Sequence, residues 1–134
     1  ITGFDRVMVY QFDSEGAGTV IAEDTDQETP YLDLHYPPSD IPKQARQLYT
    51  LNWLRLIPDA HYQPVALIPA HNPLTDQPLD LSGAVLRSVS PIHLEYLHNM
   101  GVTASMSVSL LQDQKLWGLI ACHHSSPKYV PYHI

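Results

Sequence analysis

Cysteine, positive charge and long hydrophobic runs are all scarce in this sequence. Cys122 is the only cysteine in 134 residues, so no internal disulfide can form, in agreement with a reducing compartment. Seven lysines and arginines stand against 14 aspartates and glutamates, and the net charge of −7 disfavours a nucleic-acid surface. No hydrophobic run is long enough to span a membrane, and no basic leader with a hydrophobic centre opens the chain. We therefore expect a cytoplasmic protein that binds neither nucleic acid nor membranes.

The composition predicts a single globular domain over residues 1–134. Hydrophobic residues make up 44% of the chain and charged residues 16%. Proline is unusually frequent, with 12 residues against a usual share of about 5%. Five prolines fall between residues 64 and 91, which predicts long loops there, and such loops are usually functional. Because residues 125–134 form no closing helix and a strand begins almost at residue 1, we expect a fragment of a larger protein.

Alternating and β-branched residues predict two hairpins. The first joins strands 6–12 and 18–23 through a turn at residues 13–16, and the second joins strands 104–111 and 115–123. A separate strand is predicted at 53–57, and a further short one at 65–68.

Two helices are predicted between these hairpins. One begins at about Pro42, with Ser39 or Asp40 as its N-cap, and the other begins at Pro91 with Ser90 as its N-cap and ends before Gly101. The order of elements predicts an α+β fold with one antiparallel sheet, helices packed on it and a pocket roofed by loops.

The chemistry concentrates between residues 80 and 111. His93, Tyr96, Leu97 and Met100 share one face of the second helix. The strand that follows alternates between hydrophobic residues and the serines at 105, 107 and 109. Arg87 lies just ahead of the helix. This stretch therefore places a histidine, a tyrosine, an arginine and a row of hydroxyls within reach of one cavity.

Two kinds of catalytic centre are disfavoured. Eight histidines and the run Cys122–His124 invite a metal site, but the chain has no CxxC or HxxxH pair, and His93 and His98 fall on different helix faces. A serine hydrolase would need a strained nucleophile turn, and no GxSxG is present. We therefore expect neither a metal centre nor an enzyme.

A pocket for an elongated anionic ligand is the remaining interpretation. Arg55 and Arg87 each have apolar sequence neighbours, which predicts partly buried guanidinium groups that need an anionic partner. The two N–H groups of a guanidinium suit a propionate or a phosphate, and Ser105 and Ser107 can donate to the same oxygens.

Simpler interpretations stay open at this point. Arg87 can pair with Asp80 or Glu95, and the serines can face water. His93 can be an ordinary core histidine, Asp40 only a helix cap, and Cys122 a buried, inert thiol.

Long segments of the sequence closely resemble one family, the GAF domain of phytochromes and in particular of bacteriophytochromes. The segments are PPSDIPKQARQLYTLNWLRLI, LDLSGAVLRSVSPIHLEYLHNMGVTASMSVSLL and LWGLIACHH, with ITGFDRVMVYQFD similar to the first strand. The resemblance implies a central antiparallel sheet flanked by helices. It further implies a linear tetrapyrrole (bilin), either biliverdin or, as the alternative, phycocyanobilin. The domain would sense red and far-red light by photoisomerisation of this cofactor and relay the change to an output domain.

The resemblance also assigns roles to individual residues. The backbone carbonyl of Asp40 would accept from the protonated pyrrole nitrogens, and His93 would stack beside the inner rings. Arg87 and Arg55 would bind the B-ring propionate in one or the other photostate. Ser105 and Ser107 would bind the C-ring propionate, and His123 would reach the D-ring carbonyl. The other implied cofactor-binding residues are Tyr10, Tyr36, Tyr49 and Tyr96 around the D ring or the Asp40 carboxylate, together with Ile41, Ser90 and Ile92.

One departure from plant-type phytochromes decides the subtype. Those proteins carry the bilin-linking cysteine directly before the pocket histidine, where this chain has Ile92. Bacteriophytochromes instead use a cysteine N-terminal to this domain, so covalent attachment within residues 1–134 is not expected.

The resemblance implies neighbouring domains as well. A PAS domain would precede the GAF domain and a PHY domain would follow it, in a homodimeric receptor whose output module is often a histidine kinase. The loop at 58–81 would embrace the N-terminal segment, and without that segment some apolar surface should be exposed. The alternative is a bilin-free GAF domain that serves as a dimerisation or small-molecule regulatory module.

Overall fold

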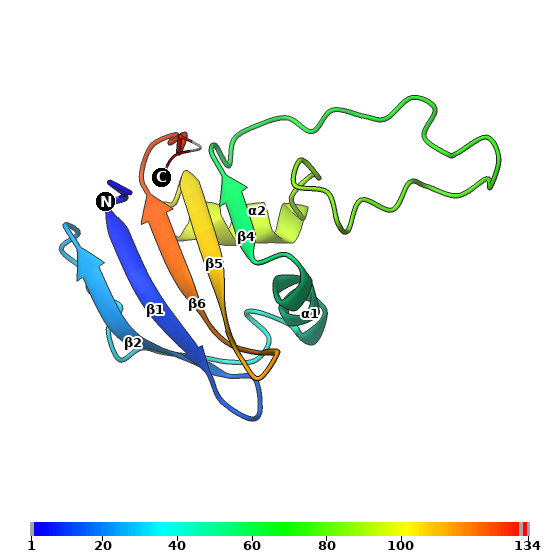
Figure 1. Cartoon of the computed structure of the whole chain (residues 1–134). Coiled ribbons are helices and arrows are strands. Elements are labelled where there is room, and N and C mark those ends of the chain that lie inside the picture. Colours follow the sequence, from blue (N-terminus) through cyan, green and yellow to red (C-terminus); the bar gives the residue numbers. More distant parts are fainter. Residues whose placement is uncertain (1, 132, 134) are drawn as a thin grey trace.

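A six-stranded antiparallel sheet forms the centre of the molecule (Figure 1). The computed structural model describes residues 2–131 and 133. The strand order across the sheet is β3-β2-β1-β6-β5-β4. The strands are β1 (Arg6–Phe12), β2 (Gly18–Thr25), β3 (His35–Tyr36), β4 (Leu54–Ile57), β5 (Ala104–Gln112) and β6 (Lys115–His124). The helices are α1 (Lys43–Leu51) and α2 (Pro91–Asn99). The predicted α+β fold is confirmed.

Both hairpins and both helices lie where the sequence predicts them, and three details differ. The strand predicted at 65–68 is wrong: these residues are irregular, because the prolines on either side cannot donate to a ladder. The two-residue strand β3 is missing from the prediction, because so short a segment carries no periodicity. Neither Ser39 nor Asp40 caps α1, whose N-cap position is Pro42.

The second helix follows its terminal signals closely. Ser90 occupies the N-cap position of α2 and Pro91 is the first helical residue, although the Ser90 side chain makes no capping hydrogen bond. Gly101 follows the helix with φ of +68°, a left-handed conformation that glycine adopts without strain.

The register of the strands sorts their residues onto two faces. Arg6, His123 and Ser105 stand opposite one another across β1, β6 and β5, so their side chains share one face. The next row on that face holds Met8, Ala121, Ser107 and Arg55. The opposite face carries the hydrophobic residues of β5, which pack with Phe4 and Cys122 in a separate cluster.

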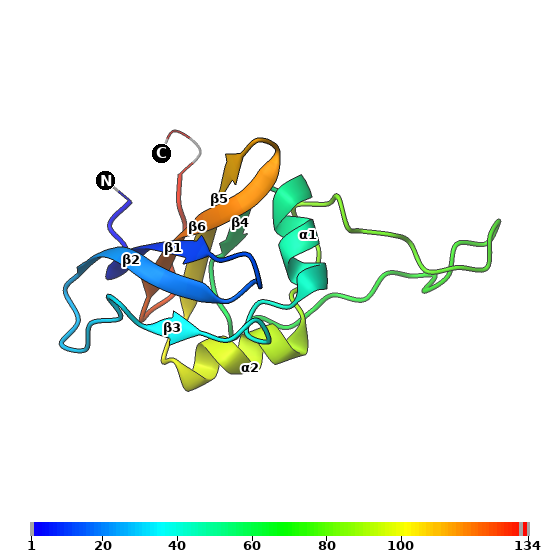
Figure 2. The same ribbon diagram turned by 90° about the horizontal axis from the view of Figure 1, so that it is seen from below.

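The helices lie on the face that carries Arg6 and the serines. Figure 2 shows α2 below the sheet, with α1 beside it near the β4 edge. Leu97 of α2, which is 2% exposed, packs with Ile57, Ala60 and Val102 in another hydrophobic cluster. Within the described residues, no helix is long and apolar enough to cross a membrane.

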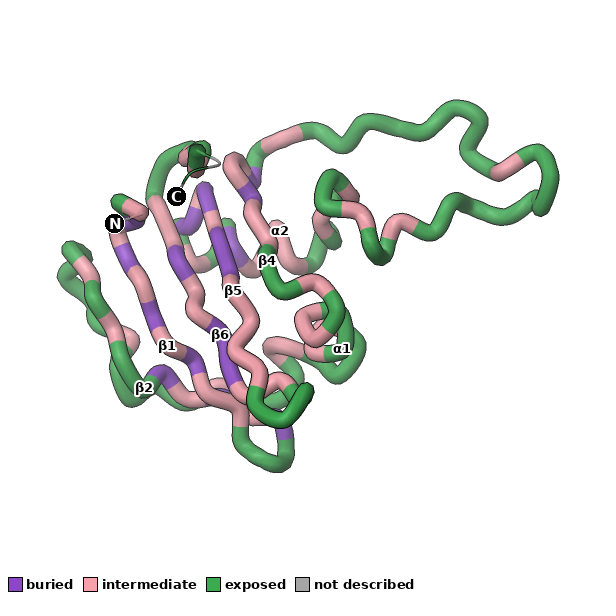
Figure 3. Tube along the Cα trace, viewed as in Figure 1, coloured by how far each residue is buried: buried purple, intermediate pink, exposed green. Residues whose placement is uncertain are grey.

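The connection between β4 and α2, residues 58–90, is a long loop that extends away from the sheet. It is exposed along most of its length (Figure 3). Large hydrophobic side chains on it are uncovered, among them Ile68 at 94% and Leu86 at 97% exposure. The exposed apolar surface expected for this part of the chain is present.

Candidate functional site

A cavity of about 870 Å³ lies between the sheet face, α1 and α2. All 14 residues singled out by sequence line it. Those on strands and helices are Tyr10, Tyr36, Tyr49, Arg55, His93, Tyr96, Ser105, Ser107 and His123, with Pro91's neighbour Ile92 at the start of α2. The connecting segments contribute Asp40, Ile41, Arg87 and Ser90. Residues up to 113 positions apart therefore meet at one site.

Two arginines bring positive charge to this cavity. Arg55 stands on β4 opposite Ser107, and Arg87 lies in the connection before α2, where its Nη1 donates to the Ala84 carbonyl at 2.7 Å. The proposed pairing of Arg87 with Asp80 or Glu95 is wrong, since no ion pair of Arg87 or Arg55 with a carboxylate occurs among the described residues. These guanidinium groups are available to an anionic ligand.

The serines of β5 have two different functions in the fold. Ser107 is buried and lines the cavity with Ser105, so the interpretation that both merely face water is wrong. Ser109 instead donates its hydroxyl to the Tyr49 carbonyl at 2.6 Å, which fastens β5 to α1. The sequence pattern alone treats all three serines alike.

The two cavity histidines are held in the neutral form. Burial and, to a smaller extent, the nearby Arg55 charge lower the pKa of His93 to about 4. Burial also lowers the pKa of His123 to about 4, with contributions from Arg6 and His93. His93 stacks against Tyr96 one turn later, with ring centroids 6.4 Å apart and an interplanar angle of 12°.

This protonation state predicts acid sensitivity. The ordinary histidine pKa of 6.5 applies to the unfolded chain, which therefore binds protons between about pH 6.5 and pH 4 that the folded chain does not. Stability is full above pH 6.5 and declines toward pH 4. We expect the urea midpoint of wild type to fall over this range and that of His123→Gln to fall less. His71→Gln, an exposed control, should follow wild type, and equal pH profiles in all three proteins would contradict the assignment.

Tyrosines form much of the remaining wall. Tyr10 is buried against Phe12 and Tyr36, with ring centroids 5.2 and 5.8 Å away. Burial raises the pKa of Tyr10 and raises that of Tyr96 to about 12, so both remain neutral phenols. The Tyr10 ring occupies the space that a Cβ on Gly18 would need, which explains the glycine at the start of β2.

The structure decides whether Asp40 is only a helix cap and whether Cys122 is buried. Asp40 is half-buried at the cavity and is not the cap of α1, so its position is not explained by capping. Cys122 is 1% exposed on the opposite face of the sheet, and burial raises the pKa of its thiol. The predicted burial of Cys122 is confirmed.

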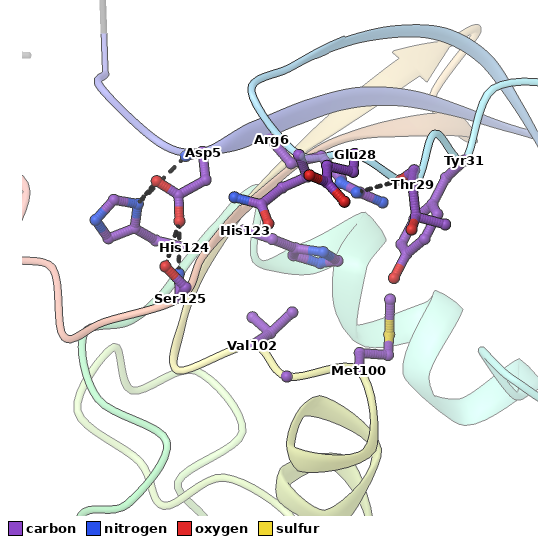
Figure 4. Close-up of a pocket in the computed structure, with 12 residues that line it drawn as sticks. Asp5, Arg6, Glu28, Thr29, Tyr31, Met100, Val102, His123, His124 and Ser125 are labelled. Carbon is purple, nitrogen blue, oxygen red and sulfur yellow. Dashed lines mark hydrogen bonds and ion pairs between the residues drawn. The ribbon is translucent and has the colours of Figure 1, made fainter.

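A second cavity of about 390 Å³ adjoins the first and was not predicted (Figure 4). His123, Tyr31 and Met100 line both cavities. The Arg6 guanidinium lies over the Tyr31 ring, 3.5 Å from its centroid, and its Nε lies 3.4 Å from the Glu23 carboxylate. The side chains of this ion pair are only 7% and 3% exposed.

The Arg6–Glu23 pair organises the loop that carries Tyr31. Glu23 accepts the backbone N–H groups of Tyr31 and Leu32 at 2.8 and 2.9 Å, while Arg6 donates to the Thr29 carbonyl. The signal for Arg6 was present in the sequence, because it shares the alternation phase of the buried residues Met8 and Tyr10. A charge in that phase indicates a buried partner.

Comparison with known proteins identifies the family. The model of the GAF domain family matches residues 1–134. The chain belongs to the GAF domain family. This GAF domain is 70% identical over 135 residues to cyanobacterial phytochrome B of Nostoc sp. strain PCC 7120, and 56% identical over 133 residues to a bacteriophytochrome of Pseudomonas aeruginosa. The alignments cover 100% and 98% of the chain and 18% of each relative, so the chain spans about a fifth of their length.

Solved structures share the fold. The chromophore-binding domain of a bacteriophytochrome from R. palustris is 55% identical, with a TM-score of 0.92 over 98% of this chain and 45% of its own. The chromophore-binding domain of a phytochrome from Stigmatella aurantiaca is 62% identical, with a TM-score of 0.88 over 98% of this chain and 43% of its own. The GAF fold expected from the sequence is therefore confirmed.

Proposed function

We propose that this GAF domain is the bilin-binding sensor module of a red/far-red photoreceptor. The observation that carries the proposal is that two arginines, two serines of β5, two neutral histidines and five tyrosines line one cavity of about 870 Å³. Supporting it, the chain is similar to structures described as chromophore-binding domains of phytochromes.

The cavity fits a linear tetrapyrrole in size and in chemistry. Its volume lies within the usual range of about 300–1,000 Å³ for cofactor pockets. Arg55 and Arg87, which form no ion pair with a carboxylate among the described residues, match the negative charge of the B-ring propionate of a bilin. Aromatic and apolar walls match its extended π system.

Individual side chains of the cavity would bind different parts of the bilin. Arg87 and Arg55 hold the B-ring propionate, and Ser105 and Ser107 donate to the C-ring propionate. His93 supplies a neutral imidazole beside the inner rings, where it can exchange protons with their nitrogens.

The other predicted cofactor-binding residues make further contacts with the bilin. The Asp40 carbonyl accepts from pyrrole N–H groups, with Ile41 beside it, and His123 donates to the D-ring carbonyl. Tyr10, Tyr36, Tyr49 and Tyr96 restrain the D ring, while Ser90 and Ile92 close the wall at the start of α2. The bilin, when bound, supplies light absorption and photoisomerisation.

Biliverdin is the proposed cofactor, with phycocyanobilin as the alternative. Ile92 offers no thiol at the plant attachment position, and Cys122 is buried on the far face of the sheet. We therefore propose that covalent attachment uses a cysteine outside residues 1–134.

The proposal extends to the rest of the receptor. Because the chain covers only 18% of its relatives, we propose flanking PAS and PHY domains in a cytoplasmic homodimer with a histidine kinase output. The exposed hydrophobic residues of the 58–81 loop would be covered by the N-terminal segment. The GAF domain itself then has no catalytic role.

Mixing the purified chain with biliverdin tests binding. We expect a red absorbance band to appear with saturable titration, and no zinc-dependent fluorescence of the denatured protein, since no thiol of this chain reaches the cavity. A bilin-free regulatory GAF domain would give no red band, either from this chain or from a version extended through the N-terminal segment. Zinc-dependent fluorescence from residues 1–134 alone would contradict the assignment of the linking cysteine.

A further inference from the structure

The segment between β3 and α1 has little regular structure of its own. Residues 39–42 form part of the cavity wall, and Asp40 is among them. Pro37, Pro38 and Pro42 have no N–H to donate, and the Asp40 N–H bonds back to the Pro37 carbonyl at 3.1 Å. The segment therefore supplies few donors to its own carbonyl groups, and donors from elsewhere in the molecule can hold those groups in place.

Arg46, in the first turns of α1, supplies those donors. Its Nη1 donates to the Ile41 carbonyl at 2.6 Å and makes a longer contact of 3.4 Å with the Pro38 carbonyl. The same nitrogen contacts the Gly16 carbonyl at 3.3 Å, in the turn between β1 and β2. One guanidinium thus touches both ends of the Asp40 segment and a distant hairpin.

The hairpin turn is a firm point of attachment. Asp13 accepts the N–H groups of Glu15 and Ala17 on its carboxylate at 2.9 Å each, and its own N–H bonds to the Ala17 carbonyl at 2.8 Å. Gly16 has φ of +88°, and a Cβ there would lie 2.6 Å from Cζ of Arg46. The turn is therefore shaped to admit the guanidinium.

The side-chain hydrogen bonds of Arg46 within the described residues all go to these three backbone carbonyls. No carboxylate of the described residues forms an ion pair with it, and it does not line the cavity. A charged donor makes stronger hydrogen bonds than a neutral one, and the planar fork of arginine can reach several acceptors, which the single ammonium of lysine matches only in part.

We propose that Arg46 is a positioning residue that fastens the Asp40 segment of the cavity wall to the β1–β2 turn. The inference rests on the proposed function, because its purpose is to hold the Asp40 carbonyl in place for the bilin. Arg46 acts through the backbone and touches no ligand itself.

Amide hydrogen exchange on the cofactor-free chain tests the fastening. In Arg46→Gln we expect exchange of the Asp40 amide, which bonds to the Pro37 carbonyl, to accelerate about tenfold or more, the loss expected for a charged hydrogen bond, while β5 and β6 keep wild-type rates. Arg46→Lys should restore part of the protection. Lys43→Gln, which removes an exposed cation from the same helix, is the control and should match wild type.

A pair of glycine variants separates displacement of Arg46 from backbone strain. Gly16→Ala and Gly101→Ala both place alanine at positive φ, but only the first meets the Arg46 guanidinium, since nothing lies within 4 Å of a Cβ at Gly101. We expect only Gly16→Ala to accelerate exchange of the Asp40 amide. Wild-type exchange at this amide in Arg46→Gln, or equal acceleration throughout the sheet, would overturn the proposal.

Biliverdin binding then links the fastening to function. We expect Arg46→Gln to bind biliverdin about tenfold more weakly and Lys43→Gln to bind it as wild type does. Wild-type affinity in Arg46→Gln despite faster exchange would overturn the role of Arg46 in bilin binding. If wild type itself takes up no biliverdin, in this chain or in the N-terminally extended one, the proposed function fails, while the exchange result still decides the fastening.

Discussion

Replacing Arg55 and Arg87 together by glutamine is expected to weaken biliverdin binding by about two to four orders of magnitude. Each guanidinium faces the cavity without forming an ion pair to any carboxylate of the described residues. A hydrogen bond to a charged group contributes about 1.5–3 kcal/mol, and about 1.4 kcal/mol corresponds to a tenfold change in affinity. Each single variant should therefore lose about ten- to 150-fold, measured by titration of the red band.

A ligand without propionate charges provides the matched control for the arginine variants. Biliverdin dimethyl ester carries no propionate charge, so wild type should bind it much more weakly than the free acid, and the double variant should distinguish the two ligands little. Lys115→Gln removes one positive charge, as each single arginine variant does, but at an exposed site on β6, and should bind both ligands as wild type does. If the double variant still prefers the free acid as strongly as wild type, the arginines do not bind the propionates.

Breaking the buried ion pair between Arg6 and Glu23 is expected to have the largest effect on stability. Arg6→Met leaves the Glu23 carboxylate, whose side chain is 3% exposed, without its cation. Removal of one partner of a buried pair costs about 3–5 kcal/mol, a large share of the about 5–15 kcal/mol that stabilises a typical domain. We expect this loss in urea unfolding, together with faster amide exchange in the loop that carries Tyr31.

A double variant keeps this prediction testable if Arg6→Met folds poorly. Arg6→Met with Glu23→Gln removes the uncompensated charge, while the amide oxygen can still accept from the Tyr31 and Leu32 backbones. It should be more stable than Arg6→Met alone, since contacting residues are not additive. Lys115→Met serves as the surface control. A loss below about 1 kcal/mol in Arg6→Met would show that the pair behaves like an exposed salt bridge.

Local signals in the sequence predicted the elements that hold the site. Pro91 and Gly101 mark the ends of α2, and the alternation in β5 separates its serines from its hydrophobic residues. These signals succeed because they depend on the backbone of a few neighbouring residues. The resemblance to phytochromes then supplied the membership of the cavity, which spacing alone left open.

The sequence did not reveal the contacts that connect distant segments. Arg46 bonds to the carbonyl of Gly16, 30 residues away, and Glu23 accepts from the loop that follows its own strand. The partners of these side chains are backbone carbonyl and N–H groups, which leave no mark on residue type. The strand wrongly predicted at 65–68 fails for a different reason, because the flanking prolines Pro64 and Pro69 cannot donate to a neighbouring strand.

The decisive measurement is the absorbance of the biliverdin-loaded chain under alternating red and far-red light. If the cavity residues hold a bilin as a light-sensitive cofactor, red light should deplete the red band and far-red light should restore it over repeated cycles. A bound biliverdin whose spectrum does not change under either light would contradict the photoreceptor function and leave the domain as a bilin-binding module only.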